Sequence, residues 1–347
     1  MYDKELKQMA EMSVIAGKDP DITQGGGGNT SVKLDGELMA VKASGCKLKD
    51  MTECKGFVVL NYRKVREYYD RVDLDSGVDY YADSAEFVKN NSVELPNMEK
   101  GMRASVEAGF HSLLKKYVVH THSVYANLLC CTREGKDLAA ELFGQGKHPF
   151  IWLPYTAPGF MLTLEIKRAL DRLDSVPGMI FMESHGLIIT SDQYEECREL
   201  GDMVTEKVRT RMGITEPYGH VGIQQTGENT YASDSDILRG YFQGSNKDAD
   251  WFERTILYPD QAAYLSGNIS TDPGRQNKIN INLSTGDITY ATNQKEALTM
   301  EESIAAFIFI LETAGKSGLH IMTMTQEQID FIKNWEGVQY RKNLLKK

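Results

Sequence analysis

Two histidines stand two positions apart in the segment VVHTHSVYAN, residues 118–127. The segment begins with residues that favour an extended chain, and alternate side chains of a strand point to one face, about 6.6 Å apart along the backbone. His120 and His122 could therefore bind one metal ion, with Thr121 facing the opposite side. An isolated pair of this kind is also typical of two half-buried, hydrogen-bonded histidines in a sheet.

A third ligand must come from elsewhere, because a catalytic zinc site usually takes three protein ligands and leaves one position open. His185 is the best candidate, since it stands beside a glycine between the two apolar halves of GMIFMESHGLIIT. Neutral imidazole suits zinc and several other divalent metals. A cupin-type site would place a carboxylate shortly after the histidine pair, and positions 124–128 offer none.

Small and polar residues in three segments could hold an anion. The segment GGGGNTS, residues 25–31, would bring backbone N–H groups close to an anion, with Asn29 and Ser31 as further donors. The turn KASG, residues 42–45, and Ser105 add hydroxyl groups that could fold back beside it. Taken alone, a glycine run is more typical of a flexible surface turn. No Walker or dinucleotide motif is present, so a nucleotide cofactor is not indicated.

The elements that position these residues follow from the hydrophobic pattern. Helices are predicted over about residues 3–17, 98–117, 159–173 and 192–212. Strands are predicted on both sides of the Asp35-Gly36 turn, in YVVHTH, and on both sides of the turn at residues 183–186. The early hairpin argues against a doubly wound sheet, so we predict a layered α/β fold with a central, mainly antiparallel sheet flanked by helices.

The composition changes after about residue 222, where the polar, turn-rich segment QQTGENTYASDSD begins. We predict a catalytic domain over residues 1–222 and a small α+β extension over residues 223–347. The extension should contain a hairpin across INLSTGDITYAT and two helices, at roughly 299–315 and 325–345. This C-terminal third shows no catalytic pattern.

Charge and apolar content exclude several classes of protein. Asp plus Glu number 49 and Lys plus Arg 39, a net charge of −10 without a basic stripe, so no nucleic-acid partner is expected. No apolar run is long enough for a membrane helix, and the N-terminus lacks a signal-peptide pattern. We therefore expect no membrane partner and a cytoplasmic protein. The five cysteines, without a CxxC motif, fit reduced thiols.

Five ordered pieces of the chain resemble the class II aldolase/adducin superfamily, which includes L-fuculose-1-phosphate and L-rhamnulose-1-phosphate aldolases and L-ribulose-5-phosphate 4-epimerase. The pieces are GGNTS, KASG, SVE followed by His111, HTH and SHGL, within about residues 1–220. The resemblance implies zinc, or another divalent metal, bound by His120, His122 and His185. It also implies a phosphate cradle formed by Gly28, Asn29, Ser44, Gly45 and Ser105.

The same resemblance implies a reaction: reversible cleavage of a ketose 1-phosphate to dihydroxyacetone phosphate and a short aldehyde, by a homotetrameric class II aldehyde-lyase. The metal would act as a Lewis acid at the substrate carbonyl, and Glu107 would shuttle the proton at the neighbouring carbon. Judged by its spacing alone, Glu107 could instead be a solvated carboxylate on a helix flank, paired with Arg103 or His111. Tyr155 would protonate the aldehyde oxygen, unless it only packs against the following helix.

Four other functions on this scaffold stay open: a sugar-phosphate 4-epimerase, a decarboxylase, a dehydratase, and a metal-free adducin-like binding module. The epimerases generally carry Asp where Glu107 stands, which favours the aldolase. The chain departs from the family pattern at Ala104, where many members have a second serine, and in the residues beyond about 222.

Overall fold

The computed structural model describes residues 2–345 and divides into two compact units, each discontinuous in sequence. The first unit comprises Met1–Asp19, Gly28–Thr121 and Ala140–Val204. The second unit comprises Pro20–Gly27, His122–Ala139 and Thr205–Lys347. The sequence boundary near residue 222 stays a prediction.

The first unit is built on an eight-stranded sheet in the order β4-β3-β2-β1-β5-β8-β7-β6. All neighbouring strands are antiparallel except β6 and β7, which run parallel. The strands are β1 (Asn29–Lys33), β2 (Leu38–Lys42), β3 (Phe57–Asn61), β4 (Ser92–Val93), β5 (Tyr117–Thr121), β6 (Phe150–Leu153), β7 (Met179–Met182) and β8 (Gly186–Ser191). The predicted central, mainly antiparallel sheet is confirmed.

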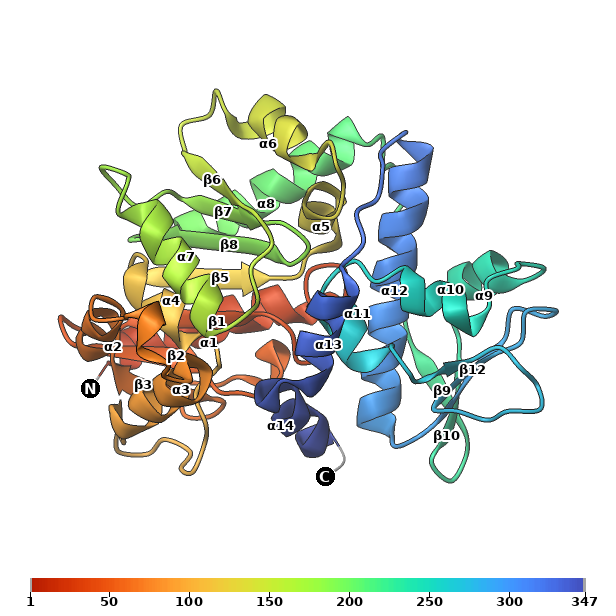
Figure 1. Cartoon of the computed structure of the whole chain (residues 1–347), viewed down its shortest axis with the longest axis horizontal. Coiled ribbons are helices and arrows are strands. Elements are labelled where there is room, and N and C mark those ends of the chain that lie inside the picture. The colour runs from red at the N-terminus through yellow and green to blue at the C-terminus, as the bar shows by residue number, and fades with distance from the viewer. Residues whose placement is uncertain (1, 346–347) are drawn as a thin grey trace. The chain divides into compact units, whose positions relative to one another are not determined.

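Helices flank this sheet (Figure 1). They are α1 (Asp3–Lys18), α2 (Tyr62–Tyr69), α3 (Tyr80–Asn90), α4 (Ala108–Leu113), α6 (Gly135–Phe143), α7 (Phe160–Leu170) and α8 (Tyr194–Arg211). Helix α1 packs on β1 and β5. Apolar residues of α2, α4 and α7 form two buried clusters with the strands, so these helices supply much of the core.

Alternation along β1 assigns its side chains to two faces of the sheet. Thr30 contacts Ser13 of α1, whereas the next residue, Ser31, contacts His111 of α4. Asn29 shares the face of Ser31, because residues two apart point the same way. Its partner across the β1–β5 pair is His120. The register therefore places Asn29 and His120 side by side on the face that carries α4.

The helix predicted over about residues 98–117 is wrong except in its middle, Ala108–Leu113. The preceding segment instead joins the end of β2. The Ser44 N–H donates to the Arg103 carbonyl at 2.8 Å, and the Ser105 N–H donates to the Lys42 carbonyl at 3.1 Å. These bonds to a distant strand replace the helical ones, and they bring the polar residues before α4 to that end of the sheet.

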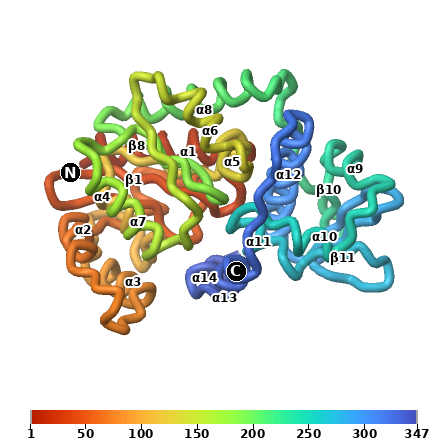
Figure 2. Tube along the Cα trace, turned by 45° about the horizontal axis from the view of Figure 1, so that its top comes forward, coloured from red at the N-terminus to blue at the C-terminus, as the bar shows by residue number. Residues whose placement is uncertain are grey.

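The second unit contains a five-stranded sheet in the order β11-β12-β13-β10-β9, in which only β11 and β12 are parallel. Its strands are β9 (Ile223–Gly227), β10 (Thr230–Ser233), β11 (Ile269–Ser270), β12 (Ile279–Ile281) and β13 (Ile288–Ala291). Its helices are α5 (Val124–Cys130), α9 (Asp236–Phe242), α10 (Ala249–Arg254), α11 (Pro259–Tyr264), α12 (Gln294–Lys316), α13 (Gln326–Asn334) and α14 (Glu336–Leu345). Figure 2 shows the long helix α12, which contacts α5, α9 and α11.

The predicted α+β character of the C-terminal extension is confirmed, including the β12–β13 hairpin. The last predicted helix is two helices, because Trp335 is extended between α13 and α14. No helix within residues 2–345 is both long and apolar enough to cross a membrane. Cys130, Cys131 and Cys197 are buried, whereas Cys54 is exposed.

Candidate metal centre

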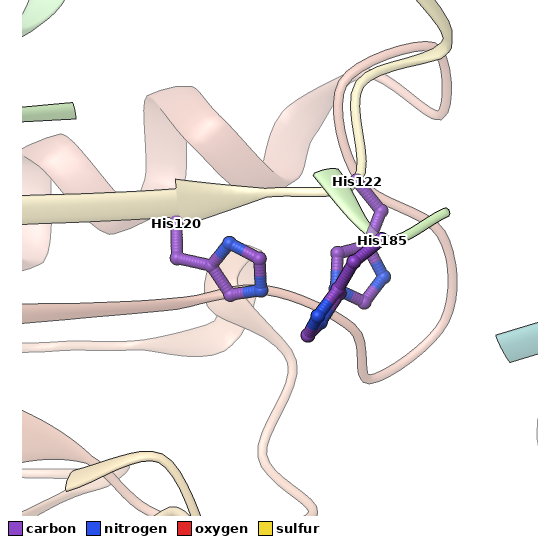
Figure 3. Close-up of side chains that lie close together, drawn as sticks. All are labelled: His120, His122 and His185. Atoms are coloured by element: carbon purple, nitrogen blue, oxygen red, sulfur yellow. The ribbon is translucent and has the colours of Figure 1, made fainter. Parts of the chain in front are cut away.

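Three buried histidines come together at the end of β5. His120 is the penultimate residue of this strand, His122 follows the strand directly, and His185 lies in the turn between β7 and β8. One ligand atom from each lies within 4.8 Å of the other two, and no residue of the three is more than 4 % exposed. Figure 3 shows the three rings gathered around one space. The three residues predicted from the sequence are thus brought together.

Hydrogen bonds fix the state of two of these rings. His120 Nδ1 lies 3.0 Å from the Leu187 carbonyl oxygen. A carbonyl only accepts, so Nδ1 carries the proton and Nε2 keeps its lone pair. His122 Nδ1 is hydrogen-bonded to Oδ2 of Asp260, in α11. By the same argument, Nε2 of His122 is the nitrogen available to a metal.

A tight turn presents the third ring. Met182 of β7 pairs with Gly186 of β8, so residues 183–185 form the connection. Ser184 adopts a left-handed φ of 48°, and the His185 N–H donates to the Met182 carbonyl at 3.2 Å. All five residues of β5 pair with β8. The turn therefore places His185 beside the end of β5.

The carboxylate of Glu107 faces two of the histidines. Its oxygens lie 3.7 Å from His120 Nε2 and 3.5 Å from His185 Nε2. The residue directly precedes α4 and is only 7 % exposed. The alternative of a solvated carboxylate on a helix flank is therefore wrong, because the segment before α4 turns inward to pair with β2.

A chain of hydrogen bonds holds this carboxylate. Asn29 Nδ2 donates to Glu107 Oε2 at 2.6 Å, and Asn29 Oδ1 contacts His111 Nε2. Burial above all, and then the neighbouring His120, lower the pKa of His111 well below its ordinary value, so this ring is neutral. A neutral ring has one N–H, which must be Nε2–H donating to Asn29. Nδ1, 2.7 Å from Ser31 Oγ, then accepts from that hydroxyl.

The residues predicted to bind phosphate lie at the same end of the sheet. Gly28 and Asn29 stand at the start of β1, and Ser44 and Gly45 follow β2, which pairs antiparallel with β1. The Ser105 hydroxyl lies 3.4 Å from Asn29 Nδ2. Gly28 and Gly45 have φ values of 62° and 82°, which favour glycine. The chain thus brings five small or polar residues to one end of the sheet, and two of them, Asn29 and Ser105, contact Glu107.

Two polar residues near the site were not predicted from the sequence, namely Asp260 and Lys42. Lys42 ends β2 and is 3 % exposed. After burial and His120, its charge is among the causes that lower the pKa of His111. A buried ammonium here favours anions. The only indication in the sequence was that Lys42 begins the KASG turn, and a lysine exposed on the surface could occupy the same position.

Tyr155 is not connected to the histidines by any hydrogen bond in residues 2–345, where its buried hydroxyl has no partner. Burial, and then the neighbouring Tyr81 hydroxyl, raise its pKa above the ordinary value. The phenol is therefore protonated at neutral pH, and its role stays a prediction.

The donor set fits a divalent metal ion. In a tetrahedral site with metal–nitrogen distances of about 2.1 Å, the ligand atoms lie about 3.4 Å apart. The three histidine nitrogens lie within 4.8 Å of one another, so small rotations of the rings would bring them to this spacing. The histidine nitrogens are buried, and at least two of the rings offer Nε2 with its lone pair. The adjacent carboxylate of Glu107 offsets the charge of a cation.

Comparisons with known proteins show which family and which proteins this chain is similar to. Residues 7–211, more than half of the chain, match the family described as "Class II Aldolase and Adducin N-terminal domain". A curated relative from Bacillus subtilis (strain 168), named "Uncharacterized oxidoreductase YuxG", is 28% identical over 203 residues. These residues are 56% of this chain and only 27% of that protein, so most of the relative lies outside the match.

Two solved structures are similar as well. The N-terminal class II aldolase domain of a conserved protein from Thermoplasma acidophilum is 23% identical, with a TM-score of 0.50 over 59% of this chain and 92% of that one. L-fuculose-1-phosphate aldolase from Thermus thermophilus is 14% identical, with a TM-score of 0.36 over 62% of this chain and 99% of that one. The first of these supports the fold.

Proposed function

Because this chain belongs to the class II aldolase and adducin family, we propose that it is a metal-dependent lyase that cleaves a ketose 1-phosphate reversibly to dihydroxyacetone phosphate and a short aldehyde. One observation carries the proposal: three buried histidines share one space, and the carboxylate of Glu107 lies within 3.7 Å of two of them. A metal-free binding module would have no use for this costly burial of a carboxylate among imidazoles.

The metal would be zinc, held by His120, His122 and His185. A divalent cation in this position supplies Lewis-acid polarisation of a substrate carbonyl. The ligand chemistry also accepts other divalent ions that bind imidazole. Since the metal polarises the carbonyl, no lysine is needed to form a Schiff base with the substrate.

Glu107 would take and return the proton at the carbon next to that carbonyl. A carboxylate held in a largely dry site suits this role, because poor solvation keeps its basicity. The bond from Asn29 Nδ2 fixes one carboxylate oxygen in place. His111 and Ser31 in turn fix the Asn29 amide, so the base is positioned by three buried side chains.

The substrate phosphate would bind at the end of β1 and β2, at Gly28, Asn29, Ser44, Gly45 and Ser105. Backbone N–H groups at glycines and two hydroxyl groups are suitable donors for phosphate oxygens. Lys42 would add a buried positive charge. A phosphate fixed here orients the reacting end of the sugar and lowers the entropy lost on the way to the transition state.

Tyr155 would supply the proton for the aldehyde oxygen, and its raised pKa keeps that proton in place. The proposal includes a cytoplasmic homotetramer, on the strength of the family resemblance. The sugar is to be found by assay.

The test uses protein loaded with zinc and a panel of ketose 1-phosphates and 5-phosphates. Release of dihydroxyacetone phosphate is followed with a coupled NADH-dependent reductase. Glu107→Gln should lower kcat by about 10²–10⁴-fold while the bound metal is unchanged. Chelation should abolish turnover, and zinc should restore it.

Glu94→Gln is the matched control, because the Glu94 carboxylate is exposed and pairs with Lys100. It should turn over like the wild type. Full turnover by Glu107→Gln would refute the assigned base. Isomerised sugar phosphate without triose phosphate would indicate an epimerase, and absence of bound divalent metal would favour the binding module.

A further inference from the structure

His122 and Asp260 are 138 positions apart in sequence, and their side chains meet within the second unit. The His122 Nδ1–H donates to Asp260 Oδ2. Both residues are buried, at 4 % and 2 % exposed. A buried carboxylate bonded to an imidazole in this way determines which ring nitrogen carries the proton.

The surrounding extension holds Asp260 in place. Every residue of α11 is buried. Gln261 braces the entry to this helix: its Oε1 accepts from the Leu257 N–H at 2.8 Å, and its Nε2 donates to the Thr255 carbonyl at 2.6 Å. The carboxylate therefore reaches His122 from a rigid element of the C-terminal extension.

The glycine run leaves room for this pair. A Cβ at Gly27 would lie 2.7 Å from Asp260 Oδ2, which is closer than real Cβ atoms come to other atoms, and 3.0 Å from both His122 Nδ1 and the Gln24 carbonyl oxygen. A Cβ at Gly26 would meet no atom within 4 Å. Only one of these two adjacent glycines is therefore required by the His122–Asp260 contact.

The same loop is tied to the extension at a second point. The Gly25 N–H donates to Glu302 Oε2 of α12 at 2.6 Å. The extension thus contacts the glycine run at Gly25 and at Gly27, on either side of Gly26. Two carboxylates of the C-terminal extension therefore make these contacts: Glu302 bonds to the glycine run and Asp260 bonds to His122. The extension itself shows no catalytic sequence pattern.

We propose that Asp260 is a positioning residue of the metal centre, and that the C-terminal extension belongs to the active site through it. Asp260 holds His122 in one tautomer and one ring orientation, with Nε2 as the ligand atom. Histidines that bind metals commonly donate their other N–H to a carboxylate, which raises their basicity and fixes the ring. The inference rests on the proposed function only in taking the three histidines as metal ligands.

The first test measures zinc affinity by competition with a chromogenic chelator and records the visible spectrum of the Co²⁺-substituted protein. Asp260→Asn keeps the size of the side chain, but an amide can turn either its oxygen or its NH₂ group to the ring and no longer enforces one tautomer. Zinc affinity should fall by about 10–100-fold, and the cobalt spectrum should change. Glu296→Gln is the control, since this buried carboxylate pairs with Lys278 instead.

A second test does not touch either partner. Gly27→Ala should weaken zinc binding in the same way as Asp260→Asn, because the new methyl group forces the pair apart, whereas Gly26→Ala should bind zinc like the wild type. Thermal melting of the metal-free proteins shows whether each variant folds. The double variant of Gly27 and Asp260 should lose little more affinity than either single variant, as expected for one shared contact.

The outcomes separate this inference from the proposed function. If His185→Ala binds zinc as tightly as the wild type, the metal centre itself is refuted. If His185→Ala loses zinc while folded Asp260→Asn keeps wild-type affinity and the wild-type cobalt spectrum, the metal centre stands and the positioning role is refuted. Equal zinc affinity of Gly27→Ala and Gly26→Ala would also overturn it.

Discussion

Replacing Asn29 by alanine should lower both the stability and the turnover of the protein. The Asn29 side chain joins the Glu107 carboxylate to the His111 ring and is 3 % exposed. Alanine removes the acceptor for the His111 Nε2–H and the donor to Glu107. Neither group can regain its bond from bulk water at this depth, so both losses count against the folded state.

The magnitude follows from these two bonds. An unsatisfied buried donor costs about 1–3 kcal/mol, and a hydrogen bond to a charged group is worth about 1.5–3 kcal/mol. A water molecule entering the space left by the amide would recover part of this. We expect the free energy of unfolding to fall by about 2–4 kcal/mol, which lowers Tm by about 3–6 °C at about 1.4 °C per kcal/mol for a chain of 347 residues.

The assay is thermal melting of the metal-free protein, so that metal binding does not shift Tm, combined with kcat and KM for triose phosphate release. The control is Thr30→Val, next in sequence, whose hydroxyl contacts Ser13 on the opposite face of the sheet. It should lose stability and keep kcat. Unchanged stability in Asn29→Ala would refute the hydrogen-bonded chain, and lost stability with full kcat would show that the chain does not position Glu107.

Two further predictions concern buried charges. Burial, partly offset by bonds from Tyr290 and Ser233, raises the pKa of Glu301 from 4.5 to about 7. Its contribution to stability is therefore complete below pH 4.5 and is lost as the pH rises through 7. Glu301→Gln should therefore raise the free energy of unfolding above pH 7 by about 3 kcal/mol. Urea unfolding should show that the stability of this variant depends less on pH than that of the wild type. A pH profile like that of the wild type would contradict the prediction. Lys42→Met should raise KM for the phosphorylated substrate by about tenfold or more, with little change in kcat. This corresponds to a loss of at least about 1.4 kcal/mol in substrate binding. An unchanged KM would show that Lys42 does not contribute to the phosphate cradle.

The sheet was largely predictable because its signals are local. Alternation, the Asp35-Gly36 turn and the apolar halves around residues 183–186 each depend on neighbours in sequence. The helix predicted over residues 98–117 failed for the opposite reason. Its apolar stripe is real around Phe110, but the backbone of Arg103 and Ser105 bonds to the end of β2, which no local pattern specifies.

Some residues of the candidate site could likewise be predicted from local patterns, whereas others could not. His120 and His122 follow from the strand pattern. His185 was the best third candidate because it stands beside a glycine between two apolar half-strands, and the order of motifs in the whole chain supported the set of three. Asp260 had no signal of this kind, since its partner lies 138 positions away. Its segment, YPDQAAY, resembles any helix that begins with proline. A carboxylate whose partner is far away in sequence produces no recognisable pattern in the residues on either side of it.

The glycine run shows how contacts between residues far apart in sequence can change an interpretation made from the sequence alone. In sequence, GGGG is one flexible segment that could cradle an anion. In the structure, Gly25 is hydrogen-bonded to Glu302 of α12, and Gly27 fits only because it lacks a side chain against Asp260. A Cβ at Gly26, by contrast, would meet no atom within 4 Å. Only Gly28, beside Asn29, leads into the predicted phosphate cradle. Much of the run is therefore shaped by α11 and α12, so its glycines serve contacts with the C-terminal extension as well as the predicted cradle.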